Sequence, residues 1–89
     1  MSMLTNRYPV TEYYKEHVVD GINVSRGGGW WTAILLIEDP KTKGRFLNLY
    51  RWESNGDEWK TLKTFTIRDR GGLDKIVEAL SELREKLPE

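Results

Sequence analysis

The chain has 89 residues, 14 basic and 14 acidic side chains, and therefore a net charge of zero, and it contains no cysteine. These values fit one small domain and exclude a disulfide framework, a zinc–thiolate site and a cysteine nucleophile. The longest apolar run, residues 33–37, is too short to cross a membrane, and residues 1–10 lack the apolar stretch of a signal peptide. We therefore expect a cytoplasmic protein with no membrane partner.

Four strands are predicted after an N-terminal segment, residues 1–16, that fits either an extended arm or a short helix. The strands are residues 17–26, 30–38, 45–53 and 58–68. In the first strand, Val18, Ile22 and Val24 are expected on one side, with a bulge at Gly21.

The connections between these strands carry turn signals. The glycines at 27–29 predict a hairpin turn, since glycine tolerates a positive φ, and "SNGD" at 54–57 contains the Asn-Gly hairpin signal. "EDPKTKG" at 38–44 predicts a loop, because Pro40 cannot continue the hydrogen-bond ladder. "RGGG" could also be a phosphate-binding or RGG-type element, but it occurs once and lacks a P-loop lysine, which favours the turn.

Residues 72–87 are predicted to form a helix. Apolar residues recur there at helical spacing, and Pro88 follows the end. They are Leu73, Ile76, Val77, Leu80, Leu83 and Leu87. The prediction is an α+β fold: residues 17–89 form one domain, a four-stranded antiparallel meander packed on this helix, with one sheet face left for a ligand or a subunit. The distal leucines could also reach a second subunit.

The third and fourth strands predict two different sheet faces. Leu47, Leu49, Phe65 and Ile67 suit the side that meets the helix. The opposite face would carry Phe46, Asn48, Tyr50, Trp52, Lys60, Leu62, Thr64, Thr66 and Arg68, provided that no bulge shifts the register. The second strand is apolar on both sides, so this opposite face should be covered by the N-terminal segment, another subunit or a ligand. Trp30 and Trp31 are neighbours and must point to different faces, one under the helix and one near Tyr50 and Trp52.

Charge is unevenly distributed along the neutral chain. Residues 21–72 carry a net charge of +3, whereas residues 73–89 carry −2 and residues 1–20 carry −1. A basic sheet can therefore exist within a protein whose net charge is zero.

Single-stranded nucleic acid is the ligand that an aromatic and basic sheet face would suit. Unpaired bases stack on aromatic rings, and Lys and Arg contact the phosphates. The expected stacking residues are Trp30, Trp31, Phe46, Tyr50, Trp52 and Trp59, of which one of the two adjacent tryptophans would serve. The expected phosphate contacts are Arg26, Arg45, Arg51, Lys60, Lys63 and Arg68. The alternative is that these rings form a second small core or a dimer interface.

No catalytic or metal-binding motif stands out. His17 is the only histidine, the carboxylates lack metal-loop spacing, and no nucleophile–His–Asp or HExxH pattern occurs. We expect a binding protein without cofactors or metal, not an enzyme.

The stretch "RFLNLYRWESNGDEWKTLKTFTIRDRGGLDKIVEALSELREKL", residues 45–87, resembles the strand–turn–strand–helix core of PC-four-like single-stranded DNA-binding proteins. Together with the tryptophan-rich sheet, it is similar to the ThermoDBP-related archaeal single-stranded DNA-binding proteins. The resemblance implies an antiparallel sheet with a helix, oligomeric assembly, and sequence-tolerant binding of single strands, with Tyr50, Trp52, Lys60 and Arg68 matching that type. The chain lacks the long C-terminal zipper of the founding type, which puts the mode of oligomerisation in doubt.

Three hypotheses follow. The first is a nucleoid-associated homodimer or larger oligomer that binds single-stranded DNA. The second is a protein-interaction or oligomerisation module with no nucleic-acid ligand, and salt dependence would separate the two. The third is an RNA-binding factor, which the sequence does not distinguish from the first, because recognition of the 2′-hydroxyl depends on geometry.

Overall fold

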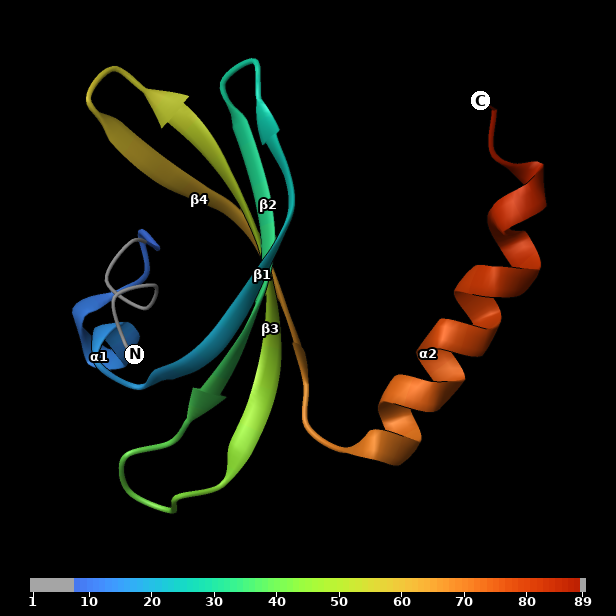
Figure 1. Cartoon of the computed structure of the whole chain (residues 1–89), viewed down its shortest axis with the longest axis horizontal. Helices are drawn as coiled ribbons and strands as arrows, with labels where there is room; N and C mark the ends of the chain where they lie inside the picture. Colours follow the sequence, from blue (N-terminus) through green and yellow to red (C-terminus); the bar gives the residue numbers. More distant parts are fainter. Residues whose placement is uncertain (1–7, 89) are drawn as a thin grey trace.

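A computed structural model describes residues 8–88 of the chain as a four-stranded sheet flanked by two helices (Figure 1). The elements in chain order are α1 (Glu12–Lys15), β1 (Val18–Gly27), β2 (Trp30–Glu38), β3 (Arg45–Asn55), β4 (Glu58–Ile67), α2 (Arg70–Leu83) and a 3₁₀ turn, η2 (Arg84–Lys86). The strands pair antiparallel in the spatial order β1-β2-β3-β4. The predicted α+β class and the meander followed by a C-terminal helix are confirmed.

Both predicted hairpins form where the turn glycines stand. Gly28 and Gly29 have φ values of 60° and 85°, and Gly56 has a φ of 71°, all in the region that favours glycine. These two turns lie together at one end of the sheet, which we call the hairpin end. The loop of residues 39–44 and the start of α2 lie at the other, which we call the loop end (Figure 1).

The loop at residues 39–44 is held by the side chain of Asp39. Its Oδ1 accepts backbone N–H bonds from Lys41 at 2.8 Å and from Thr42 at 3.2 Å. These bonds stabilise the ionised carboxylate and lower the pKa of Asp39 below its ordinary value. The loop therefore depends on an aspartate, in addition to the proline that the sequence pointed to.

Strand irregularities differ from the expected ones. The register of β1 slips between Val18 and Asp20 and again between Asn23 and Ser25, and not at Gly21. As a result, Val18 pairs with Ile37 whereas Ile22 pairs with Ile34, so these two β1 residues lie on opposite faces and not on the same side. A third irregularity lies in β4, where Lys63 pairs with Arg51 but Thr61 pairs with Trp52.

The hydrophobic core lies on the sheet face that carries Trp52, which we call the Trp52 face. Its buried residues are Val18, Trp31, Ala33, Leu35, Ile37, Phe46, Tyr50 and Trp52. Tyr8 is buried against this cluster, and Val10 and Tyr14 pack on it. Residues 8–14 of the N-terminal segment therefore provide the cover that the sequence analysis left open between three candidates.

Gly21 permits this cover to approach the sheet. A Cβ at this position would stand 2.8 Å from Leu35 Cδ2 and 2.9 Å from both Cε2 and the hydroxyl oxygen of Tyr8. Such distances are shorter than real carbon contacts, so the glycine is required by the close passage of Tyr8 and not by a bulge.

The opposite side of the sheet, which we call the Leu49 face, is only partly covered. Rows of paired residues cross it from strand to strand: Trp30, Glu53 and Lys60; Thr32, Arg51 and Lys63; Ile34, Leu49 and Phe65; Leu36, Leu47 and Ile67. The two rows nearest the hairpin end are polar and cationic, with one tryptophan, and the next two are apolar. Phe65 remains 55% exposed.

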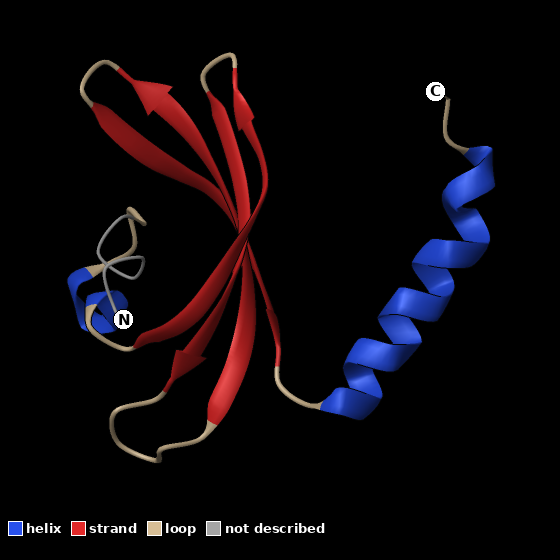
Figure 2. Ribbon diagram, viewed as in Figure 1, coloured by secondary structure: helices blue, strands red, loops and turns tan. Residues whose placement is uncertain are grey.

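The C-terminal helix does not pack on its own sheet, contrary to the sequence-based expectation. Figure 2 shows α2 standing on the side of the Leu49 face, separate from the strands, while α1 lies on the Trp52 side. No residue of α2 is buried, and Leu80 is 64% exposed. Helical periodicity predicts that one face of a helix will be buried but does not specify against which surface. Among residues 8–88, no residue of the stripe is buried, although Leu73 in its first turn lines a pocket with strand residues.

Candidate nucleic-acid interface

The two adjacent tryptophans point to opposite faces, as strand geometry requires. Trp31 is 2% exposed and lies in the core, where its ring centroid is 4.8 Å from that of Trp52. Trp30 lies on the Leu49 face and is 39% exposed. Trp30 is therefore the tryptophan that an external ligand could reach.

Most of the rings expected to stack with bases form the core instead. Tyr50 and Trp52 stack on each other with their centroids 5.1 Å apart, and Tyr8 covers Trp31 and Trp52 at 5.6 Å and 6.2 Å. Trp52 is fully buried, and Tyr50 and Phe46 are nearly so. With the N-terminal segment in place, Trp31, Phe46, Tyr50 and Trp52 have no ring surface for a base. These four rings therefore match the alternative in the sequence analysis that they form a core.

Polar groups within the aromatic core are largely paired. The buried Asn48 donates from Nδ2 to Tyr50 Oη at 3.0 Å and accepts at Oδ1 from Thr66 Oγ1 at 2.6 Å. Burial raises the pKa of the Tyr50 hydroxyl above its ordinary value, while the bond to Asn48 opposes that rise. Trp31 Nε1 donates to Asn23 Oδ1 at 2.8 Å, and Trp52 Nε1 has no partner among the described residues.

A cationic and aromatic patch occupies the hairpin end of the Leu49 face. The guanidinium carbon of Arg51 lies 4.6 Å from the centroid of the Trp30 ring, which is a cation–π contact. Lys63 is paired with Arg51 across β3 and β4, and Lys60 lies in the Trp30 row, next to Glu53. We call Trp30, Arg51, Lys60 and Lys63 the Trp30 patch.

Lys60 reaches this patch only because of the irregularity in β4. The sequence analysis placed Lys60 with Tyr50 and Trp52 on condition that no bulge intervened. The register shift between Arg51 and Trp52 moves Lys60 opposite Glu53, on the Leu49 face. Thr64 and Thr66 lie beyond the shift and pair with Tyr50 and Asn48 as expected.

Arg26 and Trp59 lie at the hairpin end of the other face. Arg26 stacks over Trp31, with its guanidinium carbon 3.8 Å from the ring centroid, and lies 5.4 Å from the centroid of Trp59. The Trp59 ring meets Trp31 edge-on at 5.3 Å and is only partly buried. These two residues close the margin of the core and place one further cation at the hairpin end.

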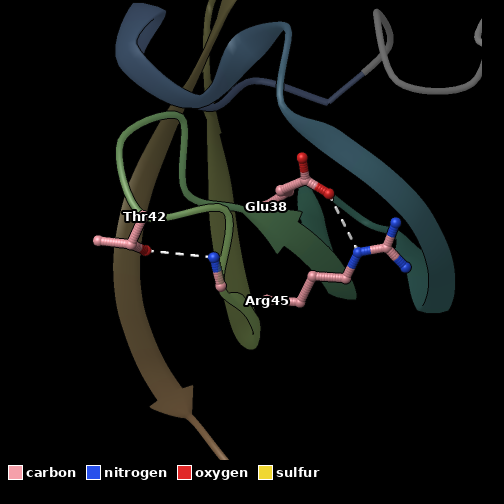
Figure 3. A network of polar contacts seen from close by, with 4 residues as sticks. Glu38, Thr42 and Arg45 are labelled. Carbon is pink, nitrogen blue, oxygen red and sulfur yellow. Dashed lines mark hydrogen bonds and ion pairs between the residues drawn. The ribbon is translucent and has the colours of Figure 1, made fainter.

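The remaining expected phosphate contacts, Arg45 and Arg68, stand at the loop end. Arg45 Nε pairs with Glu38 Oε1 at 3.2 Å, next to the loop where Gly44 N–H donates to Thr42 Oγ1 (Figure 3). The guanidinium of Arg68 lies 5.0 Å from the Phe46 centroid. The structure therefore separates the six predicted cations into four at the hairpin end and two at the loop end.

Tyr8 and Gly21 are the residues whose roles the sequence did not reveal. Tyr8 lies outside every predicted strand and helix, so no periodic pattern in the sequence marks it as a core residue. Gly21 carried the only available signal, since a glycine within a strand marks either a bulge or a close backbone approach. In the structure, Gly21 permits the close approach of Tyr8 to the sheet.

Comparison with known proteins gives no relative for this chain. No family model, no curated protein and no solved structure matches it. The similarity to the ThermoDBP-related proteins, over roughly residues 18–87, accordingly stays a prediction. Within residues 8–88, no helix is long and apolar enough to span a membrane, and no three His, Asp or Glu side chains gather as metal ligands.

Proposed function

We propose that the protein binds single-stranded nucleic acid through the Trp30 patch. The observation that carries the proposal is an exposed tryptophan with an arginine over its ring and two lysines on the same sheet face. Aromatic rings interleaved with cations are the recurring composition of surfaces that bind single strands without sequence preference. The patch sits on paired strands, so its side chains are held on a rigid support.

Binding would exchange one cationic contact for a stacked base. The guanidinium of Arg51 covers Trp30 in the free protein, at a distance where a base could take its place. The freed guanidinium and the ammonium groups of Lys60 and Lys63 would then pair with successive phosphates. Stacking on Trp30 contributes about 1–3 kcal/mol, and the phosphate contacts weaken as salt rises.

The test is a titration with oligo-dT, followed by tryptophan fluorescence at low and high salt, with duplex DNA as the control. We expect quenching by the single strand, weakened by salt and absent with duplex. Trp30→Leu should remove most of the quenching, because Trp31 and Trp52 are buried and Trp59 lies on the opposite face of the sheet. A parallel titration with oligo-U separates RNA from DNA binding.

A matched pair of cation variants locates the contact surface. Arg51→Gln/Lys63→Gln should weaken oligo-dT binding and reduce the slope of log affinity against log salt by about 1–2. Lys41→Gln/Lys43→Gln removes the same charge from exposed positions in the loop at residues 39–44 and should leave both unchanged. Equal losses in the two double variants, or no binding by the parent protein at low salt, would refute the proposal.

A protein-interaction module is the second candidate, and one observation favours it. Four of the six rings expected to stack on bases form the core instead, so no nucleic-acid ligand is needed to explain their presence. In that case the protein would show no salt-dependent quenching by oligo-dT, and its exposed apolar surfaces would account for its function.

The nucleoid-associated localisation and the archaeal family assignment also remain proposals. Both agree with single-strand binding and add no independent support to it. Co-sedimentation of the protein with nucleic acid from its host, before and after nuclease treatment, tests the localisation directly.

A further inference from the structure

Two apolar surfaces of the protein face solvent, one on a helix and one on the sheet. One is the stripe on α2 and η2, where Val77, Leu80 and Leu83 are at least half exposed. The other is the apolar half of the Leu49 face, defined by the rows of Leu49 and Leu47 together with Ile22, which pairs into the Leu49 row at Ile34. Ile22 is 68% and Phe65 is 55% exposed. Contiguous apolar patches of this kind mark interaction sites.

The start of α2 fixes its departure from the sheet. Asp69 caps the helix, with its Oδ1 accepting the Gly72 N–H at 2.6 Å. Leu73, in the first turn, lines a pocket with Leu36 and Leu47. The first turn is thus held at the loop end of the sheet, while the ribbon of the rest of the helix runs apart from the strands in Figure 1 and none of its residues is buried.

Charge indicates which partner fits. Residues 73–89, which include most of α2, carry a net charge of −2, whereas residues 21–72, which include the sheet, carry +3. On the Leu49 face, the cations Arg51 and Lys63 lie directly beside the apolar half. An α2 helix laid on the apolar half would therefore meet cations with its carboxylates. A second copy of this chain supplies both an acidic amphipathic helix and a complementary sheet face.

We propose that two copies form a closed dimer in which α2 of each copy packs on the apolar half of the Leu49 face of the other. The arrangement is reciprocal and has one two-fold axis. Both helix stripes and both apolar half-faces are covered, so neither surface is left to recruit further copies. It leaves the Trp30 row at the hairpin end uncovered. The dimer rests on the apolar half of the face and the nucleic-acid proposal on the polar half, and the two share only Arg51 and Lys63 at the border between the halves.

Cross-linking between two differently tagged copies tests this arrangement. Because the chain has no native cysteine, only the introduced thiols can react. One copy carries Phe65→Cys and the other carries Leu80→Cys, and the mixture is treated with a short bismaleimide. We expect a covalent product that contains both tags. Thr61→Cys, which lies in the Trp52 row on the opposite face, replaces Phe65→Cys in the control and should give no such product.

Three results would overturn the proposal. A chain that carries both Phe65→Cys and Leu80→Cys could cross-link only within itself, which would mean that α2 closes on its own sheet. Leu80→Cys could cross-link only to Leu80→Cys, which would mean that helices join without a sheet. The parent protein could sediment as one copy at every concentration.

A pair of alanine variants tests the energetics while preserving the helix. Leu80→Ala/Leu83→Ala should raise the dissociation constant of the dimer by at least about a hundredfold, because four leucine side chains leave the two equivalent contacts. Lys75→Ala/Glu82→Ala changes two positions on the polar side of α2, keeps the net charge and should leave the dimer intact. Circular dichroism of all variants verifies that α2 still forms. Equal dissociation constants for the two double variants would contradict the packing of the stripe on a partner.

Discussion

Replacing Tyr8 by alanine would test whether the Trp52 face is a core or a ligand surface covered by a chain segment. Tyr8 is 6% exposed, and its ring covers those of Trp31 and Trp52. Loss of a buried aromatic side chain costs about 3–5 kcal/mol, and we take the low end because the resulting gap opens to solvent. We therefore expect Tyr8→Ala to lose about 3 kcal/mol of unfolding free energy, a large share of the total for so small a domain.

Urea unfolding followed by tryptophan fluorescence measures this loss. With a slope of about 1 kcal/mol per molar urea, typical of a small domain, the midpoint should fall by about 3 M. Tyr13→Ala is the matched control, because Tyr13 is 51% exposed in the same segment and should shift the midpoint far less. The reasoning would be refuted if Tyr8→Ala kept the parent midpoint and instead bound oligo-dT more tightly. That result would make the segment a displaceable cover over a binding surface.

Three further perturbations probe other parts of the fold. Gly21→Ala should destabilise the protein by about 1–3 kcal/mol in the same urea assay, because the added methyl overlaps Leu35 and Tyr8, and a midpoint equal to that of the parent would contradict this close approach. Because the pKa of Tyr50 is raised in the folded protein, the unfolded chain loses the hydroxyl proton first as pH rises. The contribution of Tyr50 to stability should therefore be full below about pH 10 and should fall as pH rises further. Tyr50→Phe should abolish this part of the alkaline loss, measured as the change in urea midpoint with pH. Asp69→Ala should weaken α2 by about 1 kcal/mol and reduce the helical circular dichroism on heating, whereas Asp69→Asn, which can still accept the Gly72 N–H, should retain most of it.

Local signals predicted the elements and their order. The β2 strand occupies the expected residues 30–38, because an apolar run is bounded by glycines on one side and by Asp-Pro on the other. Both glycine turns formed because their backbone requirement is local. The opposite orientations of Trp30 and Trp31 follow from strand alternation alone, although alternation does not say which of the two is buried.

Features that depend on distant contacts were not predictable in this way. The side of Lys60 depended on one unpaired residue in β4, which has no signature in a strand of mixed polar and apolar residues. The cover over the core comes from Tyr8, whose aromatic partners Trp31 and Trp52 lie more than twenty residues away in the chain. For α2, an apolar stripe predicts burial, but whether the partner surface belongs to the same copy or to another is not a property of the stripe.

The division of the Leu49 face into two halves makes the two proposals separable and also couples them in one measurable way. If α2 exchange places two Trp30 patches on one particle, a long oligonucleotide can engage both, and the second contact gains from the high effective concentration. Leu80→Ala/Leu83→Ala should then weaken binding of a long oligo-dT while leaving unchanged the affinity for an oligomer too short to reach both patches. Arg51→Gln/Lys63→Gln should weaken binding of both lengths and weaken the dimer only slightly, because exposed charge contacts at the border contribute far less than the buried leucines. Equal losses for the short and long oligomers in the leucine variant would mean that the two patches act independently, even if the dimer itself is demonstrated by cross-linking.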